Sequence, residues 1–388
     1  NRLCKGRVKI IDKNWNRMPI SNIEVDEKVL KLIHYNLAFK PWHFEDILYK
    51  EYFWKYAKET FVYEEIKQIL DSYTDKEREQ DALSCERLMQ TAIYEANKED
   101  NYLNIITKGT TKSKERLQVL DKIAKFEREG RFDEDVEEDP PTKELLPENI
   151  DYLRTKLSSR IKSKFAYAIA RKYVYNLMDE KKFIIKEIKG IEHYKNLDSG
   201  AIITCNHFNA MDSFAMQLTY EASGQKKRKF YRVIREGNYT SFPGFYGILM
   251  RNCHTFPLSS NKDTMKKFLK SMDQVLQEGH FMLIYPEQSM WWNYRKPKPL
   301  KRGGFTFAVK NNVPVLPCFI TMEDSEVLDD DGFYVQEYTV HISEPIYPSA
   351  DKSRDQNIKD MMEKNFAVWK DIYEKTYHEP LVYGEKIV

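Results

Sequence analysis

The alternation of strand-like and helical segments between residues 183 and 345 constrains the fold of this chain most. The strand-like runs cover residues 183–188, 201–205, 229–234, 281–285 and 313–320, and the helical segments cover residues 214–222, 264–277 and 304–310. Strands that alternate with helices form a sheet with helices packed on its faces. The sequence therefore predicts an α/β domain in which a mixed sheet is flanked by helices.

An acidic segment precedes this domain. Residues 133–141 carry six carboxylates and two prolines in nine positions, a composition that suits neither a helix interior nor a strand. The residues before it, from about 75 to 130, are charged and have helical periodicity. The sequence thus predicts three parts: residues 1–75, a charged helical segment with an acidic linker at 76–147, and the α/β domain at 148–388. The region before the domain is expected to be mainly helical.

Residues 150–178 predict a basic amphipathic helix. Apolar residues recur at spacings of four from Leu153 to Tyr173 and are interleaved with cations. The cations are Arg154, Lys156, Arg160, Lys162, Lys164, Arg171 and Lys172. Such a helix binds an anionic membrane surface, or it packs against its own domain; both interpretations are open.

The composition indicates which partners and which cellular compartment to expect for this chain. The net charge is only +2, from 62 Lys and Arg against 60 Asp and Glu, so no global field attracts nucleic acid and none is expected as a partner. Five cysteines without a C-x-x-C spacing favour free thiols in a reducing compartment over disulfides or a zinc site. No apolar run reaches 18 residues, and no signal-peptide pattern is present. We therefore expect a cytoplasmic protein, peripheral on the inner face of the membrane, without a metal.

His207 and Asp212 lie five positions apart, where a strand-like run ends and a helical run begins. A loop at such a join can bring the imidazole and the carboxylate within hydrogen-bond distance. The carboxylate then orients the ring, and the other ring nitrogen can accept a proton from an alcohol. This pattern predicts His207 as a general base that Asp212 orients.

A second group of residues follows the strand-like run at 281–285, which leads directly into Pro286 and Glu287. Cations then come at Arg295, Lys296, Lys298, Lys301 and Arg302, immediately before Gly303 and Gly304. Cations next to exposed backbone N–H groups can bind a phosphate monoester. A solvated basic loop is the alternative interpretation.

Taken together, these stretches resemble the lysophospholipid acyltransferase family, which includes bacterial 1-acylglycerol-3-phosphate acyltransferases. The family's N-H-x4-D motif is matched by Asn206, His207 and Asp212. Its Pro-Glu-Gly motif is matched by Pro286 and Glu287, with Gln288 in place of Gly. Its V-P-x-x-P strand is matched by Val313, Pro314 and Pro317. The Arg that ends the family's second motif is missing, since its position falls near Ser259 or Ser260. Arg251 or the cations at 295–302 could supply that charge instead.

The resemblance implies attack of an acceptor hydroxyl on an acyl thioester, with no covalent acyl-enzyme, no metal and no cofactor. His207 and Asp212 would be catalytic, and Asn206, Arg251, Glu287, Arg295, Lys301, Arg302 and Gly303 would bind substrate. The implied donor is acyl-CoA or acyl-carrier protein, and the implied acceptor is a lysophospholipid such as 1-acylglycerol-3-phosphate. Two alternatives remain: an acceptor hydroxyl on a glycolipid or glycan, and a non-catalytic adaptor that binds membranes peripherally.

The N-terminal region has a resemblance of its own. His34 to Trp42, followed by Tyr52, Trp54, Tyr56 and Ala57, is similar to the closing segment of family 8 glycosyltransferases. That resemblance would make His34 a manganese ligand and Lys40 a contact of the sugar-nucleotide diphosphate, with Leu37 where the family has Gly. The D-x-D metal motif that precedes this segment in the family does not occur among the residues before His34. We therefore expect His34 and Lys40 to be inert in this chain.

Overall fold

The computed structural model describes residues 13–19, 27–36, 38–98, 110–137 and 142–384, and it divides into two compact units. The first unit is Asn1–Asn101 and the second is Tyr102–Val388. This division differs from the predicted boundaries at 75 and 147. Helix α5 (Thr111–Arg128) and the acidic segment belong to the same unit as the α/β domain.

The first unit is mainly helical, as predicted. Its elements are the short 3-10 helices η1 (Lys13–Trp15) and η2 (Glu27–Val29) and the helices α1 (Lys50–Ala57), α2 (Tyr63–Ser72) and α3 (Asp75–Asn97). Helix α3 begins at a capping box. The backbone N–H of Glu77 donates to Thr74 Oγ1, and the backbone N–H of Thr74 donates to the Glu77 carboxylate at 2.8 Å. Together these bonds satisfy two backbone donors at the start of α3.

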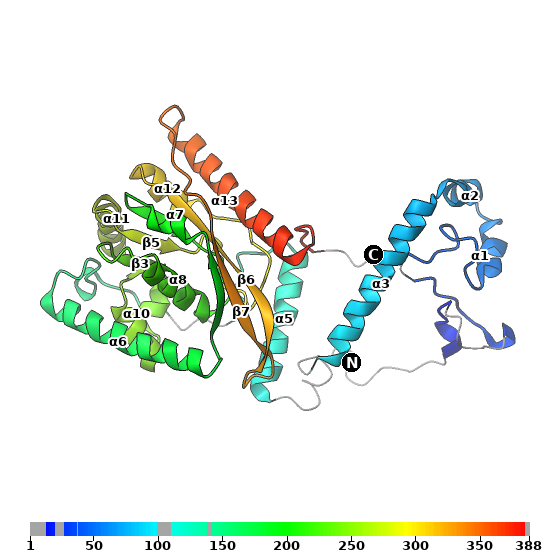
Figure 1. Cartoon of the computed structure of the whole chain (residues 1–388), viewed down its shortest axis with the longest axis horizontal. Helices are drawn as coiled ribbons and strands as arrows, with labels where there is room; N and C mark the ends of the chain where they lie inside the picture. Colours follow the sequence, from blue (N-terminus) through cyan, green and yellow to red (C-terminus); the bar gives the residue numbers. More distant parts are fainter. Residues whose placement is uncertain (1–12, 20–26, 37, 99–109, 138–141, 385–388) are drawn as a thin grey trace. The chain divides into compact units, whose positions relative to one another are not determined.

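The second unit is built on a seven-stranded sheet (Figure 1). Its strands are β1 (Ile184–Lys189), β2 (Ala201–Thr204), β3 (Phe230–Ile234), β4 (Thr255–Pro257), β5 (Phe281–Ile284), β6 (Val315–Leu328) and β7 (Tyr334–Ile342). The strand order is β1-β7-β6-β2-β5-β3-β4, and only the β6–β7 pair is antiparallel. The predicted mixed sheet is therefore confirmed.

Helices cover both faces of this sheet. Helices α6 (Leu157–Asp179), α7 (Ile191–Lys195) and α8 (Ala210–Ala222) pack on one face, and α11 (Lys262–Gln277), α12 (Gly303–Lys310) and α13 (Arg354–Tyr377) pack on the other. Successive residues of β2 point to opposite faces, so Ile203 joins the first core and Ile202 joins the second. Three short helices, η3 (Pro147–Asn149), α9 (Glu236–Thr240) and α10 (Gly244–Asn252), complete the unit.

The acidic segment forms neither helix nor strand over residues 131–137, as predicted, but it does not act as a spacer. Val136 is fully buried in a small cluster with Ile123 of α5 and Trp291. The Trp291 ring N–H donates to the carbonyl of Glu134 at 2.8 Å. One apolar residue among the carboxylates is thus enough to attach the segment to the domain. We call residues 133–137 the acidic strap.

The described part of the chain contains no helix that is long and apolar enough to span a bilayer. Four cysteines, Cys85, Cys205, Cys253 and Cys318, are buried free thiols, and Cys4 lies outside the described residues.

Candidate active site

The candidate site forms where β2 and β5 end. These strands are parallel neighbours, and Thr204 at the end of β2 pairs with Ile284 at the end of β5. The segments that follow the two strands therefore emerge at the same edge of the sheet, the edge where α/β folds commonly bind ligands. One segment carries His207 and Asp212, and the other begins with Tyr285.

His207 and Asp212 form a hydrogen-bonded pair. His207 Nδ1 lies 2.8 Å from Asp212 Oδ2, and the Asp212 side chain is fully buried in the first turn of α8. The same carboxylate oxygen accepts the backbone N–H groups of Phe208 and Asn209, at 3.0 and 3.3 Å. The imidazole side chain is 24% exposed. Because Nδ1 faces a carboxylate, it carries the proton and Nε2 is left as the acceptor.

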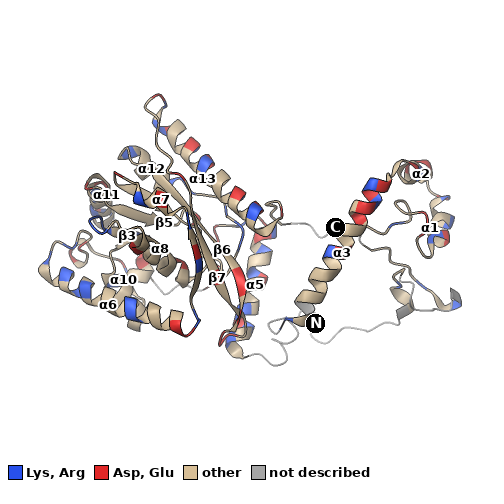
Figure 2. Ribbon diagram, in the orientation of Figure 1, with Lys and Arg blue, Asp and Glu red and all other residues tan. Residues whose placement is uncertain are grey.

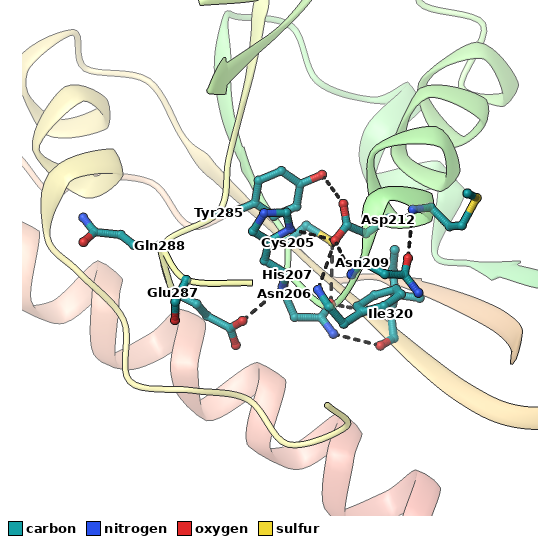
Figure 3. Close-up of polar contacts among 12 residues, drawn as sticks. Cys205, Asn206, His207, Asn209, Asp212, Tyr285, Glu287, Gln288 and Ile320 are labelled. Carbon is teal, nitrogen blue, oxygen red and sulfur yellow. Dashed lines mark hydrogen bonds and ion pairs between the residues drawn. The ribbon is translucent and has the colours of Figure 1, made fainter. Parts of the chain in front are cut away.

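Tyr285 completes this pair (Figure 3). Its hydroxyl donates to Asp212 Oδ1 at 2.8 Å, and its ring stacks on the His207 imidazole with centroids 4.1 Å apart. Burial and the neighbouring Asp212 carboxylate raise the pKa of Tyr285 well above its ordinary value, so the phenol stays a neutral donor. Sequence reasoning missed this residue. Its place directly before Pro286 was the available signal.

Glu287 and Asn206 fix the loop that carries His207 through hydrogen bonds to the backbone. Glu287 is buried, and its carboxylate accepts the backbone N–H groups of His207 at 3.0 Å and Lys298 at 2.7 Å. Burial raises the pKa of Glu287, and it lowers the pKa of Lys298 to about 8. The Asn206 amide makes two bonds to the backbone of Ile320, at 2.8 and 3.0 Å (Figure 3). Both residues therefore hold the loop that carries His207 in place, and neither lines the cavity.

His207 and Asp212 lie on a cavity of about 750 Å³. Its walls are largely apolar, with contributions from α6, α8, β3, α10 and α11 that include Val174, Phe214, Leu218, Val233, Leu249 and Phe268. The volume lies within the range of small-molecule sites. An apolar cavity of this size that ends at an imidazole can hold a fatty acyl chain beside a general base.

Four cations also line the cavity: Arg171, Arg232, Arg235 and Lys301. Arg235 makes a bidentate pair with Asp135 of the acidic strap, with both N–O distances 2.7 Å. Lys301 pairs with Asp133 at 2.6 Å, and Arg171 pairs with Glu221 at 3.0 Å. Arg232 donates to the amide oxygen of Gln217 and to the carbonyl of Cys253. Of these cations, only Lys301 was predicted from the sequence to bind substrate, whereas Arg171 was predicted as a cation of the basic helix.

Residues 186–321 match the family model named Acyltransferase. This stretch holds His207, Asp212, Tyr285 and Glu287, and it supports an acyltransferase assignment for this part of the chain. No curated protein matches the chain. Among solved structures, the 1-acyl-sn-glycerophosphate (LPA) acyltransferase PlsC from Thermotoga maritima is similar with 21% identity and a TM-score of 0.38, covering 58% of this chain and 81% of that one. Similarity at this TM-score does not bear on the substrate.

Within the acyltransferase region, the cations predicted to bind substrate are spread over several places. Lys301 and Gly303 line the cavity, whereas Arg251, Arg295 and Arg302 do not. The Arg251 guanidinium donates to the carbonyls of Tyr239 and Phe242, at 3.3 and 3.1 Å. Arg295 pairs with Asp324 at 2.9 Å, and Arg302 pairs with Asp355 at 2.8 Å. The structure therefore places these three cations on other partners.

A buried carboxylate lies beside Ser259 and Ser260, where the Arg of the family's second motif is expected. Glu236 is buried and accepts the Ser259 hydroxyl at 2.8 Å, the Ser260 N–H at 3.0 Å and the Leu145 N–H at 2.8 Å. Burial acts to raise the pKa of Glu236, but these hydrogen bonds outweigh it and lower that pKa. The structure thus puts a carboxylate that already accepts three hydrogen bonds beside Ser259 and Ser260.

The N-terminal residues singled out from the sequence contact protein groups. His34 Nδ1 lies 3.0 Å from the amide oxygen of Asn16, and Lys40 Nζ donates to the carbonyl of Tyr35. Leu37 lies outside the described residues. Over the described ranges, no three His, Cys, Asp or Glu side chains come together in a way that could hold a metal ion. The family match does not reach residues 1–75, so their glycosyltransferase resemblance stays a prediction.

Proposed function

We propose that this protein transfers a fatty acyl group from a thioester donor to the hydroxyl of a lipid acceptor, with His207 as general base and Asp212 as its orienting partner. The observation that carries the proposal is the 2.8 Å contact between His207 Nδ1 and the fully buried Asp212, beside a large apolar cavity and within the stretch that matches the Acyltransferase family.

The chemistry follows from this geometry. The acceptor hydroxyl gives its proton to His207 Nε2 as its oxygen attacks the thioester carbonyl. The tetrahedral intermediate then collapses, the C–S bond breaks, and the imidazolium returns the proton to the leaving thiolate. Asp212 stabilises the imidazolium throughout, and a positioned base of this kind accelerates the reaction by about 10²–10⁴-fold. Acyl-CoA or acyl-carrier protein would be the donor, and no cofactor takes part.

Two acceptors fit this scheme. A lysophospholipid such as 1-acylglycerol-3-phosphate is the acceptor that the family resemblance implies. A glycolipid or glycan hydroxyl is the second candidate, and the absence of a cation at Ser259 and Ser260, where Glu236 lies instead, favours it.

Helix α6 supports a peripheral position on the membrane. Its first half exposes Leu157, Ile161 and Phe165, with exposed fractions of 72, 60 and 66%. Lysines and arginines are interleaved with them along the helix (Figure 2). The other side of α6 packs against α10 and also lines the cavity through Tyr167 and Val174. A helix that lies on the inner, anionic leaflet would therefore hold the cavity close to its lipid substrate.

The test is acyl transfer by purified protein, with labelled acyl-CoA or acyl-carrier protein and a panel of lysophospholipid and glycolipid acceptors. We expect His207→Ala and Asp212→Asn each to lower kcat by about 10²–10⁴-fold with unchanged circular dichroism. His193→Ala, in α7 and away from the cavity, is the matched control and should keep full activity. Full turnover by His207→Ala would refute the proposal. Salt-sensitive liposome binding without turnover on any donor would favour the adaptor instead.

A further inference from the structure

This inference rests on the proposed acyl transfer and decides between its two acceptors. The acidic strap, residues 133–137, forms ion pairs with cations that line the cavity. The Asp135 carboxylate accepts hydrogen bonds from both terminal nitrogens of Arg235, at 2.7 Å each. The Asp133 carboxylate accepts one from the Lys301 ammonium at 2.6 Å. Asp135 and Glu137 of the strap themselves line the cavity. Two of the four cations that line the cavity are therefore already paired with carboxylates of the strap.

The strap is attached at several points along its length. Trp291 donates to the Glu134 carbonyl at 2.8 Å, and Lys122 donates to the Val136 carbonyl at 3.2 Å. Arg116 binds Glu137 at 2.5 Å and also contacts Asp331. With Val136 fully buried between these contacts, the carboxylates of the strap are presented in fixed positions. The two ion pairs thus belong to the folded domain.

The remaining charges around the cavity balance. Arg171, Arg232, Arg235 and Lys301 line the cavity together with the carboxylates of Asp135, Glu137, Asp212 and Glu221. Of these four cations, Arg232 is the one without a carboxylate partner in the described residues, and it donates to an amide and a carbonyl oxygen. Three of the four cations that line the cavity are thus paired with carboxylates, which leaves the single charge of Arg232 against the charge of a dianion.

A phosphate monoester carries a charge of about −1.5 to −2 at neutral pH, and it needs cations or several free N–H donors. At Arg235 and Lys301 it would have to displace Asp135 and Asp133 or lie beside them as a like charge, which is unfavourable. Carboxylate oxygens are instead good acceptors for hydroxyl groups. We propose that the acceptor is an uncharged, hydroxyl-rich headgroup, the glycerol or sugar of a lipid that has no phosphate monoester.

The test compares three acceptors in the acyl-transfer assay: 1-acylglycerol-3-phosphate, its uncharged counterpart 1-acylglycerol, and an alkyl glucoside. We expect wild-type kcat/KM to favour an uncharged acceptor over the phosphate by about tenfold or more. Asp135→Asn keeps the shape of the side chain but removes the negative charge that Arg235 binds, so it should shift the ratio toward the phosphate acceptor by about tenfold. The matched control is Asp121→Asn on exposed α5, which should leave the ratio unchanged. The two uncharged acceptors separate a glycerol headgroup from a sugar.

A wild type that prefers 1-acylglycerol-3-phosphate, or an Asp135→Asn variant with an unchanged ratio, would overturn the inference. If no acceptor is acylated by any of these proteins, the proposed function fails but the inference is still decided. Equilibrium binding of 1-acylglycerol-3-phosphate and 1-acylglycerol, followed by tryptophan fluorescence without a donor, then applies the same two criteria to dissociation constants.

Discussion

The ring of Tyr285 lies on the imidazole of His207, with centroids 4.1 Å apart and planes inclined by 19°. The hydroxyl of the same tyrosine binds the Asp212 oxygen that His207 does not use, at 2.8 Å. One side chain thus restrains both members of the pair: it limits rotation of the imidazole and occupies the second oxygen of the carboxylate that orients it.

Tyr285→Phe should therefore lower kcat by about tenfold, because it keeps the stacked ring but removes a hydrogen bond to a charged group. KM should stay unchanged, since the hydroxyl already donates its hydrogen bond to Asp212. Tyr285→Leu, which also removes the stacked ring, should lower kcat further. Steady-state kinetics of the two variants checks this order. Equal activity of wild type and Tyr285→Phe would show that Asp212 needs no second donor.

The sequence predicted the parts of the site whose residues are near one another in the chain. His207 and Asp212 share one strand-to-helix loop, and the apolar runs at 201–205 and 281–285 mark the two strands that bring the motifs together. Contacts between residues that are far apart in the sequence were not predicted. Arg235 meets Asp135 across one hundred residues, and Glu236 meets Ser259 from another element. Such contacts depend on how the elements pack, which periodicity does not encode.

The same distinction applies to the fold. The five strands with apolar runs were predicted, whereas β4, with three residues, and β7, with charged residues among its apolar ones, were not. The acidic strap was interpreted as a linker because its carboxylates dominate the composition. The burial of Val136 against Trp291 decides its position, and a single apolar residue gives no periodic signal.

Gln288 provides a prediction about stability. It stands where the family has Gly, and its backbone has φ = 66°, the left-handed region that costs a non-glycine residue about 1 kcal/mol or more. Gln288→Gly should therefore raise the free energy of unfolding by up to about 1 kcal/mol, partly offset by the greater freedom of glycine in the unfolded chain. Urea unfolding measures this change. Gln288→Ala keeps a Cβ and is the control; an equal gain in both variants would rule out backbone strain as the cause.

His254 predicts acid sensitivity of the fold. Burial and the positive charges of Arg154 and Arg232 lower the pKa of His254 to about 3. In the unfolded chain an imidazole titrates near 6.5. Between these values the unfolded state holds a proton that the native state lacks, so the free energy of unfolding falls as the pH decreases from about 6.5 toward 3. For one histidine the slope approaches about 1.4 kcal/mol per pH unit.

The measurement is urea unfolding of wild type and His254→Gln at several pH values between 4.5 and 7.5. The variant should lose part of this slope, whatever its stability at neutral pH, because glutamine does not titrate. His193→Gln in α7 serves as the control and should keep the wild-type slope. Parallel curves for wild type and His254→Gln would show that another group is responsible. His341 is one such group, because burial lowers its pKa to about 4.

Helix α6 gives the last prediction. Phe165 is 66% exposed on the same stretch of helix as Leu157 and Ile161, and Lys162 and Lys164 flank it. Insertion of the Phe165 ring into a bilayer removes apolar surface from water, worth about 1.5–3 kcal/mol, and each cation near an anionic surface adds about 1 kcal/mol. Phe165→Ser should therefore weaken binding to phosphatidylserine-containing vesicles by about tenfold or more. Lys162→Glu should weaken it too and make the remaining binding less sensitive to salt.

Vesicle sedimentation at two salt concentrations checks both effects. Leu328→Ser is the matched control, because Leu328 is 42% exposed and lies at the end of β6 rather than on α6. If the protein binds vesicles through non-specific hydrophobic contacts, Leu328→Ser would weaken vesicle binding as much as Phe165→Ser. If vesicle binding is the same for all the variants, α6 does not contact the bilayer and its exposed apolar side chains require another partner. Acyl transfer to a water-soluble acceptor should remain unaffected by Phe165→Ser, because Phe165 does not line the cavity.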